Sequence, residues 1–289
     1  MKCFPANFTV GVISPAGRIE DEVFAAGTAA LQSCGAKVKI FPGACNNHAE
    51  QRYLAAGDEL RAADIQAAFA DSSIDLILAS RGGYGCARVL DMLDWEQLRQ
   101  RPVMLAGFSD ITALHWAMIA QKAGIPIAAP MLKYFAEGDD FTLKHFFAAL
   151  RGEPLRVTLP ALRGKGRVKA LPLPGNLTVA ASLAGTQYFP DTAGKTVILE
   201  DVGEKPYRLD RALTQLRLAG AFSKCEAVVF GRFSDCGSED EIMSLLRDFS
   251  AKVECPVFYD CPFGHETPML SINTAIPLEI SAPYAGGAG

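Results

Sequence analysis

Short, largely apolar runs alternate with helical patterns through the first half of this 289-residue chain. Residues 8–13, 74–79 and 102–108 are such runs, and each leads into a turn and then into apolar residues at helical spacing. Strands that are apolar on both faces must be covered on both faces, which is typical of a parallel sheet flanked by helices. The alternation therefore predicts an α/β fold with a mostly parallel sheet in its N-terminal domain.

The character of the sequence changes between residues 151 and 170. This stretch holds six basic residues and one acidic residue, with two prolines and three glycines, and it lacks helical periodicity. We interpret it as a linker between an N-terminal domain (1–150) and a smaller, β-rich α/β C-terminal domain (171–289). Its charge favours a solvated connector over a phosphate-binding patch. We expect the final apolar run, residues 272–280, to close the C-terminal sheet.

Composition argues against several classes of partner. The formal net charge is −4 and the pI is about 5.6, so nucleic acid and anionic membranes exert no bulk attraction. No window has the 18 apolar residues of a membrane span, and the first residues do not resemble a secretory signal. The eight cysteines show no C-x-x-C pair and no zinc-like spacing. These features predict a cytoplasmic protein with free thiols rather than disulfides, without a metal or other cofactor.

The segment "GFSD" (107–110) places Ser109 and Asp110 where an apolar strand becomes a helix. Ligands of parallel sheets bind at this edge, and the helix start favours negative charge there. Serine and aspartate are also preferred around helix starts, so capping alone could explain both residues. The G-x-S-x-G pattern of ordinary esterases is absent because Ile111 replaces its second glycine.

A nucleophilic serine needs a base, and the chain has four histidines. His115 lies six residues along the same expected helix, about 240° around it, and cannot easily reach Ser109. His145 fits a helix edge, and His48 lies in a loop without an evident partner. His265 follows an apolar strand, which makes it the remaining candidate, although a loop histidine is often only solvated.

The carboxylate that would orient the histidine falls in residues 197–216. Glu200 ends an apolar strand, where an isolated carboxylate is costly to bury without a partner. Asp201 and Glu204 are close competitors, and spacing alone does not choose among the three.

Six segments together resemble the LD-carboxypeptidases, the muramoyl-tetrapeptide carboxypeptidases of bacterial cell-wall recycling. The resemblance extends over residues 10–278 and rests on "GFSDIT", "RGGYGCARVL", "YLAAGDELRAADIQAAFAD", "GNLTVAASLAGT", "ILEDVGEKPYRLDRALTQL" and the "GH" at 264–265. It implies that Ser109 is the nucleophile, His265 the base and Glu200 the orienting carboxylate.

The resemblance also implies the other parts of the site. The backbone N–H groups of Asp110 and Gly83 would form the oxyanion hole, with Gly82 as the neighbouring candidate. A carboxypeptidase also needs a group that recognises the free terminal carboxylate of its substrate. Backbone N–H groups near a helix start or an arginine would suit, and Arg81 is the arginine candidate. Asn176 is a candidate substrate contact.

The chain departs from the family pattern at two places. It reads Gly264-His265-Glu266 where relatives commonly have G-H-G, and Pro174-Gly175-Asn176 where they often have G-G-N. Both differences bear on the shape of local loops rather than on the reaction.

The implied activity is that of a serine LD-carboxypeptidase, a homodimer that removes the terminal D-alanine from murein tetrapeptides through an acyl-enzyme. Two alternatives belong to other classes. A microcin-immunity hydrolase would keep the triad and cleave an acyl-nucleotide conjugate, whereas a non-catalytic α/β protein would use the glycine loop and helix starts to bind an anion.

Overall fold

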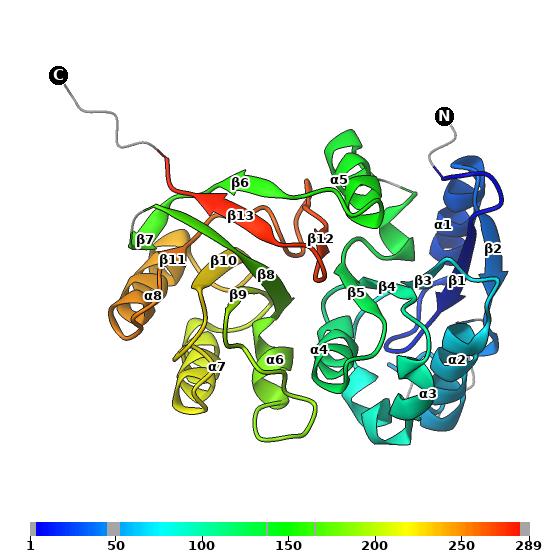
Figure 1. Cartoon of the computed structure of the whole chain (residues 1–289), viewed down its shortest axis with the longest axis horizontal. Coiled ribbons are helices and arrows are strands. Elements are labelled where there is room, and N and C mark those ends of the chain that lie inside the picture. Colours follow the sequence, from blue (N-terminus) through cyan, green and yellow to red (C-terminus); the bar gives the residue numbers. More distant parts are fainter. Residues whose placement is uncertain (1–3, 45–52, 137, 165, 284–289) are drawn as a thin grey trace.

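The computed structural model describes residues 4–44, 53–136, 138–164 and 166–283, which form two sheets that lie side by side (Figure 1). The first half of the chain builds most of one sheet and its covering helices, drawn in blue to green. The second half builds the other sheet, drawn in green to red. Helices α4 and α6 lie between the two sheets in this view, so they form the junction of the halves.

The described residues of the first half form five parallel strands and the helices that connect them. Its elements are β1 (Thr9–Ile13), α1 (Asp21–Ser33), β2 (Lys37–Ile40), η1 (Pro42–Ala44), α2 (Asp58–Ala70), β3 (Leu76–Ala79), η2 (Cys86–Met92), α3 (Trp95–Arg99), β4 (Met104–Gly107), α4 (Ile111–Gln121), β5 (Ile125–Ala128), η3 (Leu132–Tyr134) and α5 (Asp140–Leu150). All four residues of β3 are buried, as expected for a central strand with helices on both faces.

The remaining strands and three α-helices are formed by the described residues of the second half. Its elements are β6 (Arg156–Thr158), β7 (Ala161–Arg163), β8 (Arg167–Asn176), α6 (Leu177–Ser182), β9 (Lys195–Val202), α7 (Pro206–Leu218), β10 (Ala227–Ser234), α8 (Glu239–Ala251), β11 (Val257–Phe258), β12 (Ile272–Asn273) and β13 (Leu278–Ser281). Helix α8 begins with a capping box, in which Ser238 and Glu241 exchange side-chain and backbone hydrogen bonds.

Parallel pairings, which were expected for the first sheet, occur in both sheets. The first sheet runs β12-β5-β4-β3-β1-β2, with β1 to β5 parallel and β12 antiparallel to β5. The second runs β6-β13-β8-β9-β10-β11-β7, with a parallel core from β8 to β11. The α/β class with a largely parallel, helix-flanked first sheet is therefore confirmed.

Two local expectations differ from the structure. The final apolar run forms two strands, of which only β13 joins the second sheet, while β12 pairs with β5 in the first. The stretch 151–170 contains β6, β7 and the start of β8, which pair within the second sheet. Residues 151–170 as a domain boundary stay a prediction.

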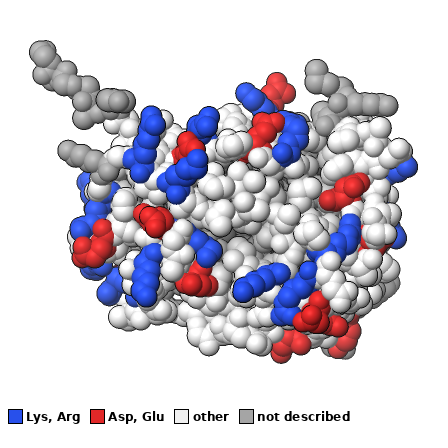
Figure 2. Space-filling view, viewed as in Figure 1, with Lys and Arg blue, Asp and Glu red and all other residues white. Residues whose placement is uncertain are grey.

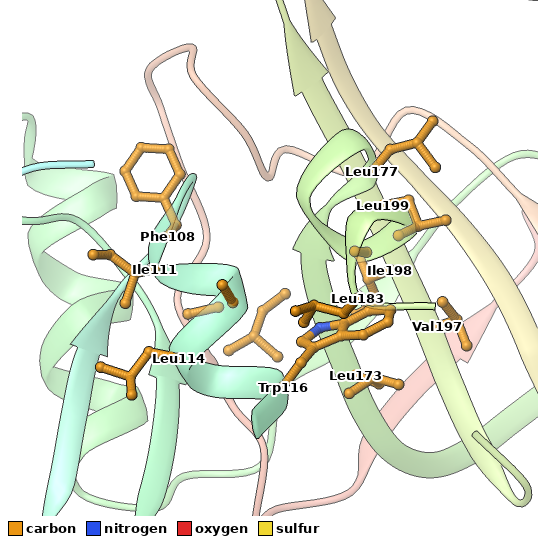
Figure 3. Packing of buried hydrophobic residues seen from close by; sticks show 14 of the residues in the cluster. Phe108, Ile111, Leu114, Trp116, Leu173, Leu177, Leu183, Val197, Ile198 and Leu199 are labelled. Carbon is orange, nitrogen blue, oxygen red and sulfur yellow. The ribbon is translucent and has the colours of Figure 1, made fainter. Parts of the chain in front are cut away.

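The two halves share one apolar core around α4 and α6. Trp116 of α4 is fully buried, and Figure 3 shows its ring directed toward Leu183 and Ile198 of the second half. Its indole N–H donates to the carbonyl of Pro174 at 2.9 Å. Because Ser109 lies just before α4, this packing fixes the serine relative to the second sheet.

The surface carries both signs of charge. Figure 2 shows Lys and Arg side chains interspersed with Asp and Glu over the visible face. Within the part of the chain that the structure describes, no helix is long and apolar enough to cross a membrane.

Candidate active site

Ser109 lies in a tight turn between β4 and α4. Its φ is 63°, a left-handed conformation that is uncommon for residues other than glycine and that often marks functional sites. The turn is packed against the glycine loop that follows β3. A Cβ atom on Gly82 would lie 2.8 Å from Cβ of Ser109 and 2.9 Å from its Oγ, so only glycine allows this approach.

Ser109, His265 and Glu200 form a continuous chain of hydrogen bonds. The Ser109 hydroxyl lies 3.0 Å from Nε2 of His265, and Nδ1 of His265 lies 2.7 Å from Oε2 of Glu200. If Nδ1–H donates to the carboxylate, Nε2 is left as the acceptor for the serine proton. The three residues come from β4–α4, from the loop after β11 and from β9.

Glu200 is completely buried in β9. Burial raises the pKa of its carboxyl group, while the hydrogen bond from His265 acts in the opposite direction. Its second oxygen, Oε1, has no partner among the described residues. Gly264 has a φ of 142°, a conformation that favours glycine. A Cβ at this position would lie only 3.2 Å from Oε2 of Glu200, so the lack of a side chain lets the loop that carries His265 come close to the carboxylate.

The two competing carboxylates are engaged elsewhere. Asp201 accepts hydrogen bonds from the Asn176 amide at 2.9 Å and from the backbone N–H and hydroxyl of Thr178. Glu204 is partly exposed and pairs with Arg208 at 3.5 Å. Among these three acidic residues, Glu200 is the one in contact with His265.

Asn176 lies in the interior rather than at an open surface. It is 5 % exposed, and its side-chain oxygen accepts from the Val179 N–H at the start of α6. Since both polar groups of the side chain bind within the protein, its contacts favour a supporting role for the Asp201 region over contact with a substrate.

The two backbone N–H groups expected to form an oxyanion hole are those of Asp110 and Gly83. Within the described ranges, neither the N–H of Asp110 nor that of Gly83 donates a hydrogen bond. The Asp110 side chain is buried and accepts from the Cys86 N–H at 2.8 Å, which ties the start of α4 to η2. The N–H of Asp110 is next to Ser109 in sequence, and Gly83 follows the glycine that contacts the serine.

The other histidines lie away from this chain of contacts. His115 is buried with Nε2 3.0 Å from the carbonyl of Leu105, and burial lowers its pKa to about 3. His145 is on α5 with Nδ1 2.8 Å from the carbonyl of Phe141. His48 lies outside the described residues.

Two residues near the site were not found from the sequence. Arg61 of α2 is buried and donates to the carbonyls of Pro15, Ala56 and Gly85, so it fixes the loops around the glycine turn. Arg61 lies four residues before Ile65 on the apolar face of α2, and this position was the sequence signal that could have indicated its burial. The second residue is Tyr134. Burial raises the pKa of its hydroxyl group to about 12, and the negative charge of Glu200 contributes to this rise.

Among the described residues, no group of three or more His, Cys, Asp or Glu side chains could hold a metal ion. Cys86, Cys225, Cys236, Cys255 and Cys261 are free thiols.

The geometry defines a class of enzyme. A serine hydroxyl next to an imidazole, which is in turn held by a buried carboxylate, is the arrangement by which serine hydrolases activate their nucleophile. The N–H groups of Asp110 and Gly83, which donate no hydrogen bond within the described residues, are candidates for the donors that acyl transfer requires.

The comparisons with known proteins identify the family. The sequence profile of the LD-carboxypeptidase N-terminal domain matches residues 10–129, and that of the LD-carboxypeptidase C-terminal domain matches residues 170–280. The murein tetrapeptide carboxypeptidase of Pseudomonas aeruginosa is 32 % identical, over 90 % of this chain and 89 % of that protein.

Solved structures share the fold. The muramoyltetrapeptide carboxypeptidase of Oxalobacter formigenes has a TM-score of 0.83 and 29 % identity, covering 92 % of each chain. The microcin C7 self-immunity protein MccF has a TM-score of 0.83 at 21 % identity, over 96 % of this chain and 94 % of that one, which is a likeness of fold alone. The chain belongs to the LD-carboxypeptidase family, and it is a hydrolase of the serine carboxypeptidase type.

Proposed function

We propose that this chain removes the terminal D-alanine from murein tetrapeptides, with Ser109 as nucleophile, His265 as base and Glu200 as orienting carboxylate. The observation that carries the proposal is the continuous hydrogen-bond chain Ser109–His265–Glu200, with distances of 3.0 and 2.7 Å. The choice of substrate is supported by the similarity to the Pseudomonas aeruginosa protein that is named murein tetrapeptide carboxypeptidase.

In the first half-reaction, His265 Nε2 removes the Ser109 proton as Oγ attacks the carbonyl carbon that joins the third residue to D-alanine. Glu200 holds Nδ1–H and stabilises the imidazolium that forms. The proton then passes from Nε2 to the departing amine, the carbon–nitrogen bond breaks, and an ester on Ser109 remains.

The negative charge of the tetrahedral intermediate would lie between the N–H groups of Asp110 and Gly83. Each such donor typically contributes about 3 kcal/mol to stabilisation of the transition state. In the second half-reaction, His265 takes a proton from water as its oxygen attacks the ester carbonyl. The bond between the carbonyl carbon and Oγ then breaks, and Nε2 returns the proton to Oγ, which restores Ser109 and releases the tripeptide acid. Each proton transfer in this scheme passes through Nε2 of His265.

We further propose that the protein works in the cytoplasm as a homodimer. Free thiols at five described cysteines suit a reducing compartment. The oligomeric state is checked by light scattering of the purified chain, for which we expect twice the mass of 30.9 kDa.

The test of the function is mass spectrometry of purified murein tetrapeptide after incubation with the protein. We expect loss of one alanine and release of D-alanine. A parallel incubation with an acyl-nucleotide conjugate examines the microcin-immunity alternative. Cleavage of the conjugate alone would transfer the function to that class, and binding without cleavage of either compound would favour the anion-binding protein.

A further inference from the structure

A cleft opens next to the glycine loop that contacts Ser109. It has a volume of about 570 Å³, and its lining includes Arg18, Arg81 and Gly83 together with the exposed rings of Tyr53 and Tyr84. Gly83 therefore belongs to both the candidate oxyanion hole and the cleft. One acidic residue, the exposed Glu20, also lines the cleft, and its carboxylate forms no ion pair with either arginine.

The two arginines in the cleft carry unsatisfied donors. Nη1 of Arg81 donates to the carbonyl of Arg18 at 2.7 Å, which holds the two residues side by side. Among the described residues, the buried Nε atoms of both arginines have no hydrogen-bond partner, and no carboxylate lies within 4 Å of either guanidinium. Buried donors without acceptors are costly, and an anion would satisfy them.

A third cation adds to the uncompensated charge. The backbone N–H of Lys133 donates to the carbonyl of Ser80, the residue before Arg81, at 3.1 Å. Burial lowers the pKa of the Lys133 ammonium, and the positive charge of Arg81 lowers it further. Lys133 lies over the ring of Tyr134 at 4.6 Å and forms no ion pair in the described part of the chain.

We propose that Arg18 and Arg81 form a subsite for the free carboxylate of the residue that leaves, and so make the enzyme an exopeptidase. The inference rests on the proposed function. In the departing amino acid, the carboxylate carbon is three bonds from the scissile carbon, a span of about 3 to 4 Å. That span suits a subsite that shares Gly83 with the oxyanion hole. A planar guanidinium also matches a carboxylate in geometry.

The competing source of a carboxylate is the acyl part of the peptide stem, which has acidic groups of its own. Two substrates separate these sources: the tetrapeptide with a free C-terminal D-alanine and the same peptide ending in D-alanine amide. The amide removes only the terminal negative charge, so a site for a stem carboxylate treats both alike.

The first experiment compares kcat/KM for the two substrates. We expect the wild type to prefer the free acid by on the order of 100-fold, as charged hydrogen bonds would give. In Arg81→Gln and in Arg18→Gln this ratio should fall at least tenfold, and Arg81→Lys should keep an intermediate ratio. The matched control is Arg163→Gln, which removes an arginine from β7 that pairs with Glu254. It should keep the wild-type ratio.

A second experiment is independent of turnover. Calorimetric titration of the Ser109→Ala variant with each peptide should show tighter binding of the free acid, and this difference should disappear when Arg81→Gln is added. Equal binding of acid and amide, or a preference that survives both arginine substitutions, overturns the subsite. A wild-type protein that binds the acid preferentially through Arg81 but releases no D-alanine would instead refute the proposed function and leave the subsite standing.

Discussion

Glu200 and Asp201 are neighbours in β9, yet they serve different parts of the structure. Successive side chains of a strand point to opposite faces, so Glu200 contacts His265 while Asp201 accepts hydrogen bonds from Asn176 and Thr178. The Asn176 amide also lies close enough to Glu200 to lower the pKa of its carboxyl group. Both carboxylates are buried, and each has polar partners. The role of a carboxylate here is therefore determined by the face of the strand on which it lies.

This arrangement predicts unequal effects of two conservative substitutions. Glu200→Gln keeps the shape of the side chain but removes the charge that stabilises the imidazolium and selects its tautomer. We expect kcat for D-alanine release to fall by on the order of 10⁴-fold. Glu204→Gln, on a partly exposed residue that pairs with Arg208, is the control and should change kcat less than twofold. A larger loss from Glu204→Gln would move the orienting role to that residue.

The residue types of the candidate triad could be predicted from the sequence, whereas their contacts could not. Spacing left Glu200, Asp201 and Glu204 open, because the choice depends on the register of β9 against β8 and β10. The contribution of Arg61 was also missed, since its hydrogen bonds join loops that are distant in sequence.

At the scale of elements, α4 connects the serine turn to the core through His115. The imidazole of His115 is buried and contacts the carbonyl of Leu105 in β4. Its pKa is lowered to about 3 from an ordinary value of 6.5, through the cost of burying a charged ring. Helix α4 is thus held against β4 by a neutral histidine.

A pH dependence of stability follows. Between about pH 3 and pH 6.5 the unfolded chain binds a proton at His115 that the native state does not, so the free energy of unfolding falls as the pH falls. The contribution approaches about 1.4 kcal/mol per pH unit. The free energy of unfolding is measured by denaturant titration at several pH values for the wild type and for His115→Gln, whose amide can still donate to the carbonyl of Leu105. The plot of this free energy against pH should be shallower for the variant. Parallel curves for the two proteins would contradict a neutral, buried His115.

The alternation of strands and helices could be predicted for the first half because each unit is local in sequence. The ends of the second half could not be, because they depend on distant partners. Strand β12 has two residues and joins the first sheet through β5, more than a hundred residues earlier. Strands β6 and β7 are similarly short, and their basic and glycine residues favoured a linker.

At the scale of the whole molecule, the candidate site depends on two halves that meet across α4 and α6. Ser109 comes from the first half, whereas Glu200 and His265 come from the second. Trp116 of the first half packs into this junction. Its ring lies among the apolar side chains of Figure 3, and its indole N–H donates to the carbonyl of Pro174. Packing between the halves therefore sets the distance between nucleophile and base.

Trp116→Phe tests this dependence. The substitution leaves the Pro174 carbonyl without its indole partner and opens space in the junction, so the free energy of unfolding should fall by about 1 to 3 kcal/mol. We expect kcat/KM for D-alanine release to fall tenfold to a hundredfold, because small displacements of catalytic groups are costly. The control is Trp95→Phe, which removes a hydrogen bond to Leu90 within the first half. Equal losses of activity in the two variants would argue against coupling through the junction.

The most direct measurement of the central claim is a double-mutant cycle on kcat for D-alanine release, with Ser109→Ala, His265→Ala and the double variant. Thermal unfolding verifies that each protein is folded. If the two residues act as one nucleophilic unit, each single substitution should reduce kcat by on the order of 10⁴- to 10⁶-fold, and the double variant should be no slower than the slower single variant. Losses that multiply in the double variant, or release of D-alanine by Ser109→Ala at the wild-type rate, would contradict the account.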